Sequence, residues 1–143
     1  MKRLALIVIL AIVVIAFATS CGQEKTSSPN ISYTDILWQG YPTDAPYSIG
    51  SYQCDFKNQF INTMDCLQKL NIQKEGQPYI LVVKNISSCG GEPAGGCYVL
   101  AEQRIYISEG ALTWVLPHEA IHWATNSGNS LHGSAYFTQC QGY

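Results

Sequence analysis

Apolar and polar positions follow a helical period in two parts of the chain. In residues 55–70, large apolar side chains recur at spacings of four and three residues, which places them along one side of a helix. These side chains are Phe56, Phe60, Met64 and Leu67. The pattern predicts an amphipathic helix that ends near Asn71.

A second helical pattern spans residues 109–126. Its apolar stripe consists of Leu112, Leu116, Ala120 and Trp123. Pro117 interrupts this pattern, because a proline inside a helix removes a backbone hydrogen bond and kinks the helix. We therefore expect that the helix either bends at Pro117 or begins close to it. Gly128 is expected to mark its end.

Shorter apolar stretches predict β-strands at 78–84, 97–101 and 104–108. The last two are close enough to be joined by a tight connection at residues 102–103. Within the third stretch, Ile105 and Ile107 point to one face of the strand. The opposite face, which carries Tyr106, is expected to meet solvent or a ligand.

Residues 31–53 are rich in Tyr, Pro and Gly and have no clear period, so they predict irregular structure packed on the domain. Helical and strand patterns together predict one α+β domain over residues 31–143. Residues 22–30 are polar, as expected of a tether that follows Cys21 and leads into this domain.

The N-terminal residues 1–20 have the pattern of an export signal. Lys2 and Arg3 precede an unbroken apolar run at 4–18. Fifteen residues in a helix span about 22 Å, which is short of the roughly 30 Å hydrocarbon layer of a bilayer. This length argues against a permanent membrane span.

The junction before Cys21 resembles the lipobox of bacterial lipoproteins, although leucine is more usual in that motif where this chain has Ala18. The resemblance implies that Cys21 becomes the lipidated first residue of the mature protein. The protein would then be exported and lipid-anchored to a bacterial membrane, on its periplasmic or cell-surface face, with the lipid bilayer as a partner. Cleavage at a nearby site without lipidation, or an uncleaved anchor, remain alternatives.

Composition limits the class of protein. Apolar residues make up 47% of the chain, but sixteen of them lie in the first twenty positions. The remainder is about 41% apolar, an ordinary value for a soluble domain, which excludes a multi-pass membrane protein and a disordered chain. The formal net charge is −2, and no basic patch is present, so nucleic acid is not an expected partner.

The six cysteines favour an oxidising compartment. If Cys21 carries lipid, five remain and one thiol is left over. Cys89 and Cys97 bracket a short Gly/Pro-rich loop and are predicted to form a disulfide. Cys54 and Cys66 flank or share the predicted helix at 55–70, about 18 Å apart, which is too far for a disulfide. Cys140 is therefore expected to pair with one of them, and a buried unpaired cysteine is the alternative for each.

All three histidines lie within fifteen residues: His118, His122 and His132. The first two belong to an H-E-x-x-H motif, in which histidines four apart on a helix share one face and can bind one metal ion. Glu119 then lies about 100° round the helix, where a general base acting on water is needed. The alternative is a helix with two surface histidines that bind no metal, or bind one weakly.

A catalytic zinc ion needs a third protein ligand and an open position. No Asp or Glu follows Glu119, which excludes the downstream glutamate of gluzincins, and Thr125 and Gly128 break the metzincin pattern. His132 is the only nitrogen ligand left downstream. A surface histidine at 132, with an upstream carboxylate or a second water on the ion, is the alternative.

The segment 132–136, His-Gly-Ser-Ala-Tyr, resembles the element that supplies the third ligand in SprT-like zincins. Over residues 104–137 the resemblance implies a compact zincin-like metalloprotease domain, in which an amphipathic helix and a small mixed sheet pack on the motif helix. It implies Zn²⁺ as cofactor, held by His118, His122 and His132, with Glu119 as the catalytic general base. Strand 104–108 would be the sheet edge that binds an extended peptide or protein substrate.

The sequence thus predicts a membrane-tethered zinc metallopeptidase. A donor for the developing oxyanion would come from Tyr106, Tyr136 or Tyr143, among which the sequence does not choose. One alternative is a non-catalytic zinc- or peptide-binding lipoprotein on the same scaffold. Another is a disulfide-braced structural lipoprotein in which the histidines only pack.

Overall fold

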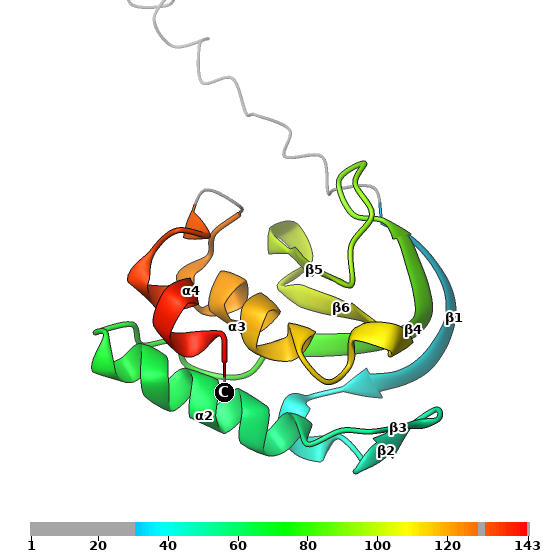
Figure 1. Cartoon of the computed structure of the whole chain (residues 1–143), viewed down its shortest axis with the longest axis horizontal. Coiled ribbons are helices and arrows are strands. Elements are labelled where there is room, and N and C mark those ends of the chain that lie inside the picture. Colours follow the sequence, from blue (N-terminus) through cyan, green and yellow to red (C-terminus); the bar gives the residue numbers. More distant parts are fainter. Residues whose placement is uncertain (1–30, 129–130, 143) are drawn as a thin grey trace, which may run out of the picture.

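The computed structural model describes residues 31–128 and 131–142, which form an α+β fold with a mixed sheet on one side and helices on the other (Figure 1). The sheet has the strand order β1-β4-β6-β5, in which β4 and β6 are parallel and the two outer pairs are antiparallel. These strands are β1 (Ser32–Gly40), β4 (Tyr79–Ser88), β5 (Gly96–Val99) and β6 (Arg104–Ser108). The predicted fold class is confirmed.

Helices, a short hairpin and single 3₁₀ turns make up the other elements of the described residues. The helices are α2 (Phe56–Lys69), α3 (Val115–Thr125) and α4 (Ala135–Cys140). The two-residue strands β2 (Ser48–Ile49) and β3 (Tyr52–Gln53) form a separate hairpin, and single 3₁₀ turns lie at Pro42–Asp44, Leu100–Glu102 and Glu109–Ala111.

Helix α2 matches its predicted bounds closely. It begins after Asp55, whose carboxylate accepts a hydrogen bond from the backbone N–H of Asn58 at 3.3 Å, an N-cap that satisfies one of the unpaired donors of the first turn. It ends before Asn71, which has the left-handed backbone angle φ 62°. The predicted apolar stripe faces the core, with Phe56 and Leu67 almost fully buried.

Helix α3 begins at Val115, so Pro117 lies in its first turn. A proline there removes no intrahelical hydrogen bond, because the first N–H groups of a helix have no partner within it. Of the two predicted outcomes, the helix therefore begins close to the proline and does not bend. Asn126, with φ 51°, ends the helix two residues before Gly128.

Both faces of the sheet are covered by apolar contacts. The face toward the helices packs Ile80, Val82, Ile105 and Ile107 against α2 and α3. On the far face, Tyr106 is 5% exposed and packs with Leu81, Val83 and Val99. The prediction that the Tyr106 side of its strand meets solvent or a ligand is therefore wrong, because β4 and β6 form the parallel centre of the sheet and are buried on both sides.

Residues 31–53 are not irregular throughout, as the sequence predicts, because they contain β1. This strand pairs antiparallel with β4 from Ser32 to Gly40, but its register shifts twice, between Ser32 and Tyr33 and between Ile36 and Trp38. The first shift leaves Ser87 of β4 without a cross-strand partner, and the second leaves Leu37 of β1 without one, which reverses the side chains that face the core along β1. The sequence of β1 therefore lacks the two-residue period that would predict a strand.

The predicted edge strand is also wrong. β6 (Arg104–Ser108) lies between β4 and β5, and β5 is the edge strand instead. β5 runs antiparallel to β6, with Cys97 opposite Tyr106. The adjacent stretches 97–101 and 104–108 could pair in either order, and local pattern does not distinguish an inner from an outer strand.

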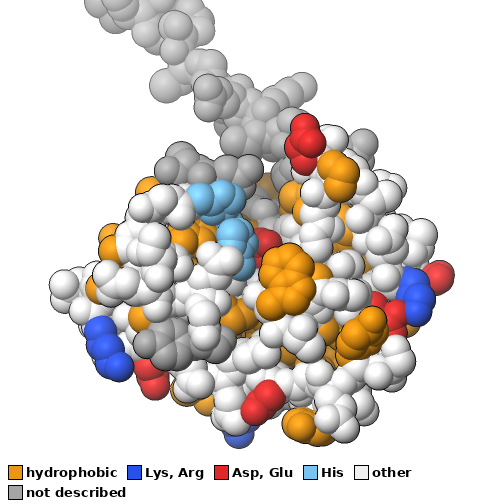
Figure 2. Space-filling view, viewed as in Figure 1, with side chains coloured by type: hydrophobic (Ala, Val, Ile, Leu, Met, Phe, Trp, Pro, Cys, Tyr) orange, Lys and Arg blue, Asp and Glu red, His pale blue; other side chains and the backbone are white. Residues whose placement is uncertain are grey.

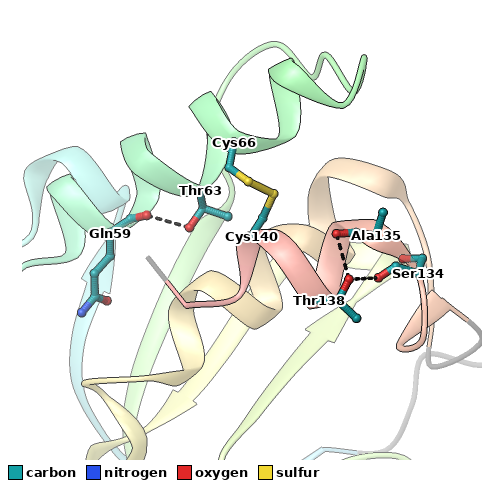
Figure 3. The surroundings of a disulfide bond; sticks show 7 residues. All are labelled: Gln59, Thr63, Cys66, Ser134, Ala135, Thr138 and Cys140. Atoms are coloured by element: carbon teal, nitrogen blue, oxygen red, sulfur yellow. Dashed lines mark hydrogen bonds between the residues drawn. A yellow bond between two sulfur atoms is a disulfide. The ribbon is translucent and has the colours of Figure 1, made fainter.

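Two disulfides brace the fold. Cys66–Cys140 joins α2 to α4 (Figure 3), and Cys89–Cys97 joins the end of β4 to β5. Both agree with the predicted pairings. Cys54 is the unpaired cysteine among the described residues, and its buried thiol donates a hydrogen bond to the carbonyl of Pro46 at 3.4 Å. Burial raises the pKa of this thiol.

The predicted export signal, the tether and Cys21 lie outside the described residues. Within residues 31–128 and 131–142, no helix is both long enough and apolar enough to cross a bilayer.

Glu109, the residue after β6, links the β2–β3 hairpin to the sheet through its side chain. Its carboxylate is 6% exposed, accepts a hydrogen bond from the backbone N–H of Ser51 at 3.3 Å, and forms an ion pair with Lys84 of β4. Gly50, with φ 59°, permits this approach, since an added Cβ would lie 2.2 Å from Glu109 Oε1. The hydrogen bonds from Lys84 and Ser51 lower the pKa of Glu109.

Replacing Glu109 by glutamine should therefore reduce stability in a pH-dependent way. The pKa of Glu109 is lower in the folded protein than the usual value of about 4.3, so its carboxylate stabilises the fold above that pH and loses this contribution on further acidification. Thermal unfolding from about pH 3 to pH 7 should show a lower Tm for Glu109→Gln at pH 7 and a narrowing difference below about pH 4. Glu75→Gln, at an exposed position, is the control, and a pH-independent difference would contradict the prediction.

Candidate metal centre

The three histidines predicted from the sequence lie together. His118 and His122 are one turn apart on α3, and His132 follows in the chain between α3 and α4. Nε2 of His122 lies 3.1 Å from Nε2 of His118 and 2.9 Å from Nε2 of His132. The three candidate ligand atoms are all within 4.8 Å of one another. The histidines can therefore reach a single ion.

These separations fit a metal ion. Nitrogen ligands at about 2.0–2.1 Å from a tetrahedral zinc ion are about 3.3 Å apart, close to the two Nε2 separations observed. Three imidazoles leave one tetrahedral position open for a water molecule or a substrate, as in catalytic sites. Imidazole ligands also suit copper, iron and nickel, so the ligand set indicates a metal site without identifying the metal.

The orientation of His122 is set by the backbone. Its Nδ1–H donates to the carbonyl of Ser127, 3.0 Å away, which leaves the lone pair on Nε2, the atom that faces the other two histidines. Phe137 packs against all three rings, with centroid distances of 4.9 Å to His118, 4.8 Å to His122 and 5.0 Å to His132. This phenylalanine is 3% exposed, so it forms an apolar floor under the ligands.

Two of the histidines, His118 and His122, are held in the uncharged form that binds metals. Burial, reinforced by the nearby His118 and His132, lowers the pKa of His122 to about 4. Burial and the nearby His132 likewise lower the pKa of His118. Near neutral pH both side chains are therefore neutral and no proton has to be displaced before an ion binds.

Glu119 lies beside the first histidine but is much more enclosed. It is 6% exposed, and burial raises its pKa to about 8, an effect that a hydrogen bond from the backbone of Tyr98 partly offsets. Gly96 of β5 lies directly against it, because a Cβ added at Gly96 would be 2.9 Å from Glu119 Oε1. The carboxyl group is therefore enclosed between α3 and the edge strand.

A cleft of about 370 Å³ opens over this group of residues. Its walls are α3, β5, the loop before β5 and the residues after α3, including His118, Glu119, His122 and His132. Figure 2 shows histidine side chains at the surface, a carboxylate beside them and a large hydrophobic side chain on the adjoining wall. A molecule in the cleft would reach the histidines, Glu119 and the outer edge of β5 together.

Two of the predicted oxyanion donors, Tyr106 and Tyr136, are not at the cleft. Tyr106 is buried on the far face of the sheet, Tyr136 packs against the core and does not line the cleft, and Tyr143 lies outside the described residues. Tyr98, which sequence reasoning missed, does line the cleft, and its hydroxyl donates to Asn126 Oδ1 at 3.2 Å.

Sequence reasoning also missed Phe137 and Gly96. The H-G-x-x-aromatic pattern identifies Tyr136 as its aromatic residue, but the next residue, Phe137, carries the ring that contacts the histidines. Gly96 is one of several glycines around Cys89 and Cys97, and nothing in its neighbours marks it as the one that approaches Glu119.

Comparisons with protein-family models, with curated proteins and with solved structures found no match to this chain. What the protein does has to be inferred from the residues of its own site.

Replacing Gly96 by alanine should disturb this site and destabilise the fold. The added methyl group would lie 2.2 Å from Val115 Cγ1 in the first turn of α3, a contact that requires strand and helix to move apart. Overpacking of this kind costs about 1–3 kcal/mol. Urea unfolding should show the loss for Gly96→Ala and not for Gly110→Ala, where the added Cβ meets no atom within 4 Å. Equal stability of the two variants would contradict the prediction, because it would show that β5 can move away from α3 with no loss of free energy of unfolding.

Proposed function

We propose that this protein is a zinc metallopeptidase that acts outside the cytoplasm, tethered to a membrane through lipidated Cys21. The observation that carries the proposal is the convergence of three imidazoles in an open cleft, with a buried glutamate next to the first of them and a free strand edge alongside. The two disulfides support an oxidising environment.

Each group at the site has a distinct task in peptide hydrolysis. His118, His122 and His132 would hold the ion. Zinc bound there supplies a Lewis acid, which lowers the pKa of water and polarises a carbonyl group. The positive charge of a bound ion would lower the pKa of Glu119 from its metal-free value of about 8, so that the carboxylate could take the proton of the attacking water molecule and pass it to the nitrogen of the leaving amine. Its position beside a histidine, enclosed from bulk solvent, suits it to both transfers.

The edge strand β5 supports a peptide as the substrate. On its outer side no other strand pairs with it within the described residues. The backbone of Tyr98 is already hydrogen-bonded to Glu119, so the remaining outward N–H and C=O groups of β5 are those available to an extended chain. A peptide that adds to this edge gains main-chain hydrogen bonds irrespective of its sequence. Its backbone would run along the cleft past Glu119.

A purely structural role for the histidines is less well supported. Buried packing would account for His122, but His132 is exposed and His118 is only half-buried, and both line the cleft. A protein that binds zinc or peptide without catalysis would use the same three histidines. Such a protein has no need of the Glu119 carboxylate, which is costly to bury.

The proposal is tested with the purified full-length chain. We expect one zinc ion per chain by elemental analysis, cleavage of unfolded casein, loss of cleavage with a chelator, and recovery on adding zinc. His132→Ala should weaken zinc retention, whereas Ser87→Ala, in β4, should not. Failure to take up zinc at micromolar concentration would contradict the proposal.

A further inference from the structure

Trp114 stands out among the exposed apolar side chains because it lines the cleft. Its side chain is 58% exposed, whereas Trp123 is 3% exposed and Trp38 packs on the core. The other large exposed apolar side chains of the described residues lie away from the cleft. An indole left open in a cleft beside candidate catalytic groups is suited to contact a ligand, since it offers a large rigid apolar surface at little cost in conformational entropy.

The place of Trp114 in the chain positions it beside the metal centre. It immediately precedes α3 and lies four residues before His118. Four residues of a helix span about 6 Å along its axis, and Trp114, as the N-cap residue of α3, stands at the start of this spacing. Across the cleft wall, a Cβ added at Gly95 would lie 3.4 Å from Trp114 Cη2, so the missing side chain lets the indole reach the residues just before β5.

The neighbours of Trp114 in the cleft favour an uncharged partner. Pro93, Ala94 and Gly95 line the same cleft and contribute no charge. Glu92 and Glu119 are its two carboxyl groups, and no Lys or Arg is found among its described lining residues. An acidic side chain bound beside Trp114 would lie near Glu92 with no Lys or Arg to compensate its charge, and the proposed ion at the histidines is reserved for the peptide carbonyl, so such a side chain is disfavoured.

We propose that Trp114 forms an apolar subsite that selects peptides with a large apolar side chain beside the scissile bond and discriminates against acidic ones. This inference rests on the proposed peptidase function. With the peptide backbone held along β5 and its carbonyl at the histidines, a neighbouring side chain lies within reach of the indole. A large apolar side chain is favoured because its contact with the indole removes apolar surface of both groups from water.

Cleavage mapping tests the subsite directly. The full-length protein is incubated with unfolded casein and the new termini are identified by mass spectrometry. Leu, Phe and other large apolar residues should be enriched next to the cut bonds, and Asp and Glu depleted. Trp114→Ala should lower kcat/KM at these sites by about tenfold or more, while Trp114→Phe retains most of the activity. Tyr47→Ala, an exposed aromatic position outside the cleft, should change nothing.

Peptide binding separates failure of the subsite from failure of the peptidase. In Glu119→Gln, indole fluorescence is followed while a decapeptide with a central Phe, or the same peptide with a central Asp, is added. The Phe peptide should change the emission and bind about tenfold more tightly, and Trp114→Phe should remove the signal. If casein is not cleaved but this preference is found, the peptidase assignment fails and the subsite stands. Equal binding of both peptides, or cuts with no apolar preference, would overturn the subsite.

Discussion

Glu119→Gln is expected to retain zinc and to cleave unfolded casein about 10²- to 10⁴-fold more slowly than the wild-type protein. The amide preserves the shape of the side chain but cannot accept the proton of the attacking water molecule. The proposed metal ligands are the three histidines and not Glu119, so zinc content should stay at one ion per chain. Zinc by elemental analysis and initial rates measured on the same sample would check both parts.

We do not expect Glu119→Gln to lose activity through unfolding. Burial raises the pKa of Glu119 to about 8, far above its usual value of about 4.3, so the folded state without metal carries a cost at pH 7 for keeping this group buried. The amide removes that cost. Metal-free Glu119→Gln should therefore be at least as stable as the metal-free wild type at pH 7, and the difference should close as the pH falls toward 4.

The matched control for this experiment is Glu75→Gln, which changes an exposed carboxylate away from the cleft and should leave the rate unchanged. Full activity of Glu119→Gln would exclude Glu119 as the general base. Unchanged peptide binding combined with no cleavage by either the wild type or the variant would favour the non-catalytic binding protein.

Removing the Cys66–Cys140 disulfide is expected to destabilise the domain by about 4 kcal/mol. The bond joins positions 74 residues apart, and a long closed loop restricts the unfolded chain more than a short one. Against a total stability of about 5–15 kcal/mol for a domain, this is a large fraction. Urea unfolding of the double variant Cys66→Ala, Cys140→Ala would measure it.

The second disulfide supplies the matched control. Cys89 and Cys97 are only 8 residues apart, so their double alanine variant should lose about 2.5 kcal/mol by the same reasoning. The order of the two losses is the critical result. A greater loss for the short loop would mean that packing around Cys97, which is 2% exposed, matters more than chain entropy.

Helices α2 and α3 could be predicted because their apolar stripes depend on local spacing, whereas the six-residue helix α4 was not predicted. Phe56 and Leu67 face the core because the period of α2 places them there. The sheet was harder to predict, since strand order is decided by pairing between distant segments. β1 in particular is hard to recognise because the extra residue Leu37 breaks its alternation between Ile36 and Trp38.

The candidate site likewise contains residues that the sequence identifies and residues that only tertiary contacts reveal. His118 and His122 could be placed from their spacing, because four residues on a helix bring two side chains onto one face. His132 could be identified only as the last available nitrogen ligand, and the structure brings it to the other two. Phe137, Gly96 and Trp114 belong to the site through tertiary contacts, for which the sequence contains no local signal.

The Cys66–Cys140 bond closes a covalent ring that contains β4, β5, β6, α3 and all three histidines. A single backbone cut anywhere inside this ring leaves both pieces joined by the disulfide. Cys89–Cys97 gives the same protection to the exposed loop at the mouth of the cleft. A chain cut once inside either ring would thus keep every part of its site attached.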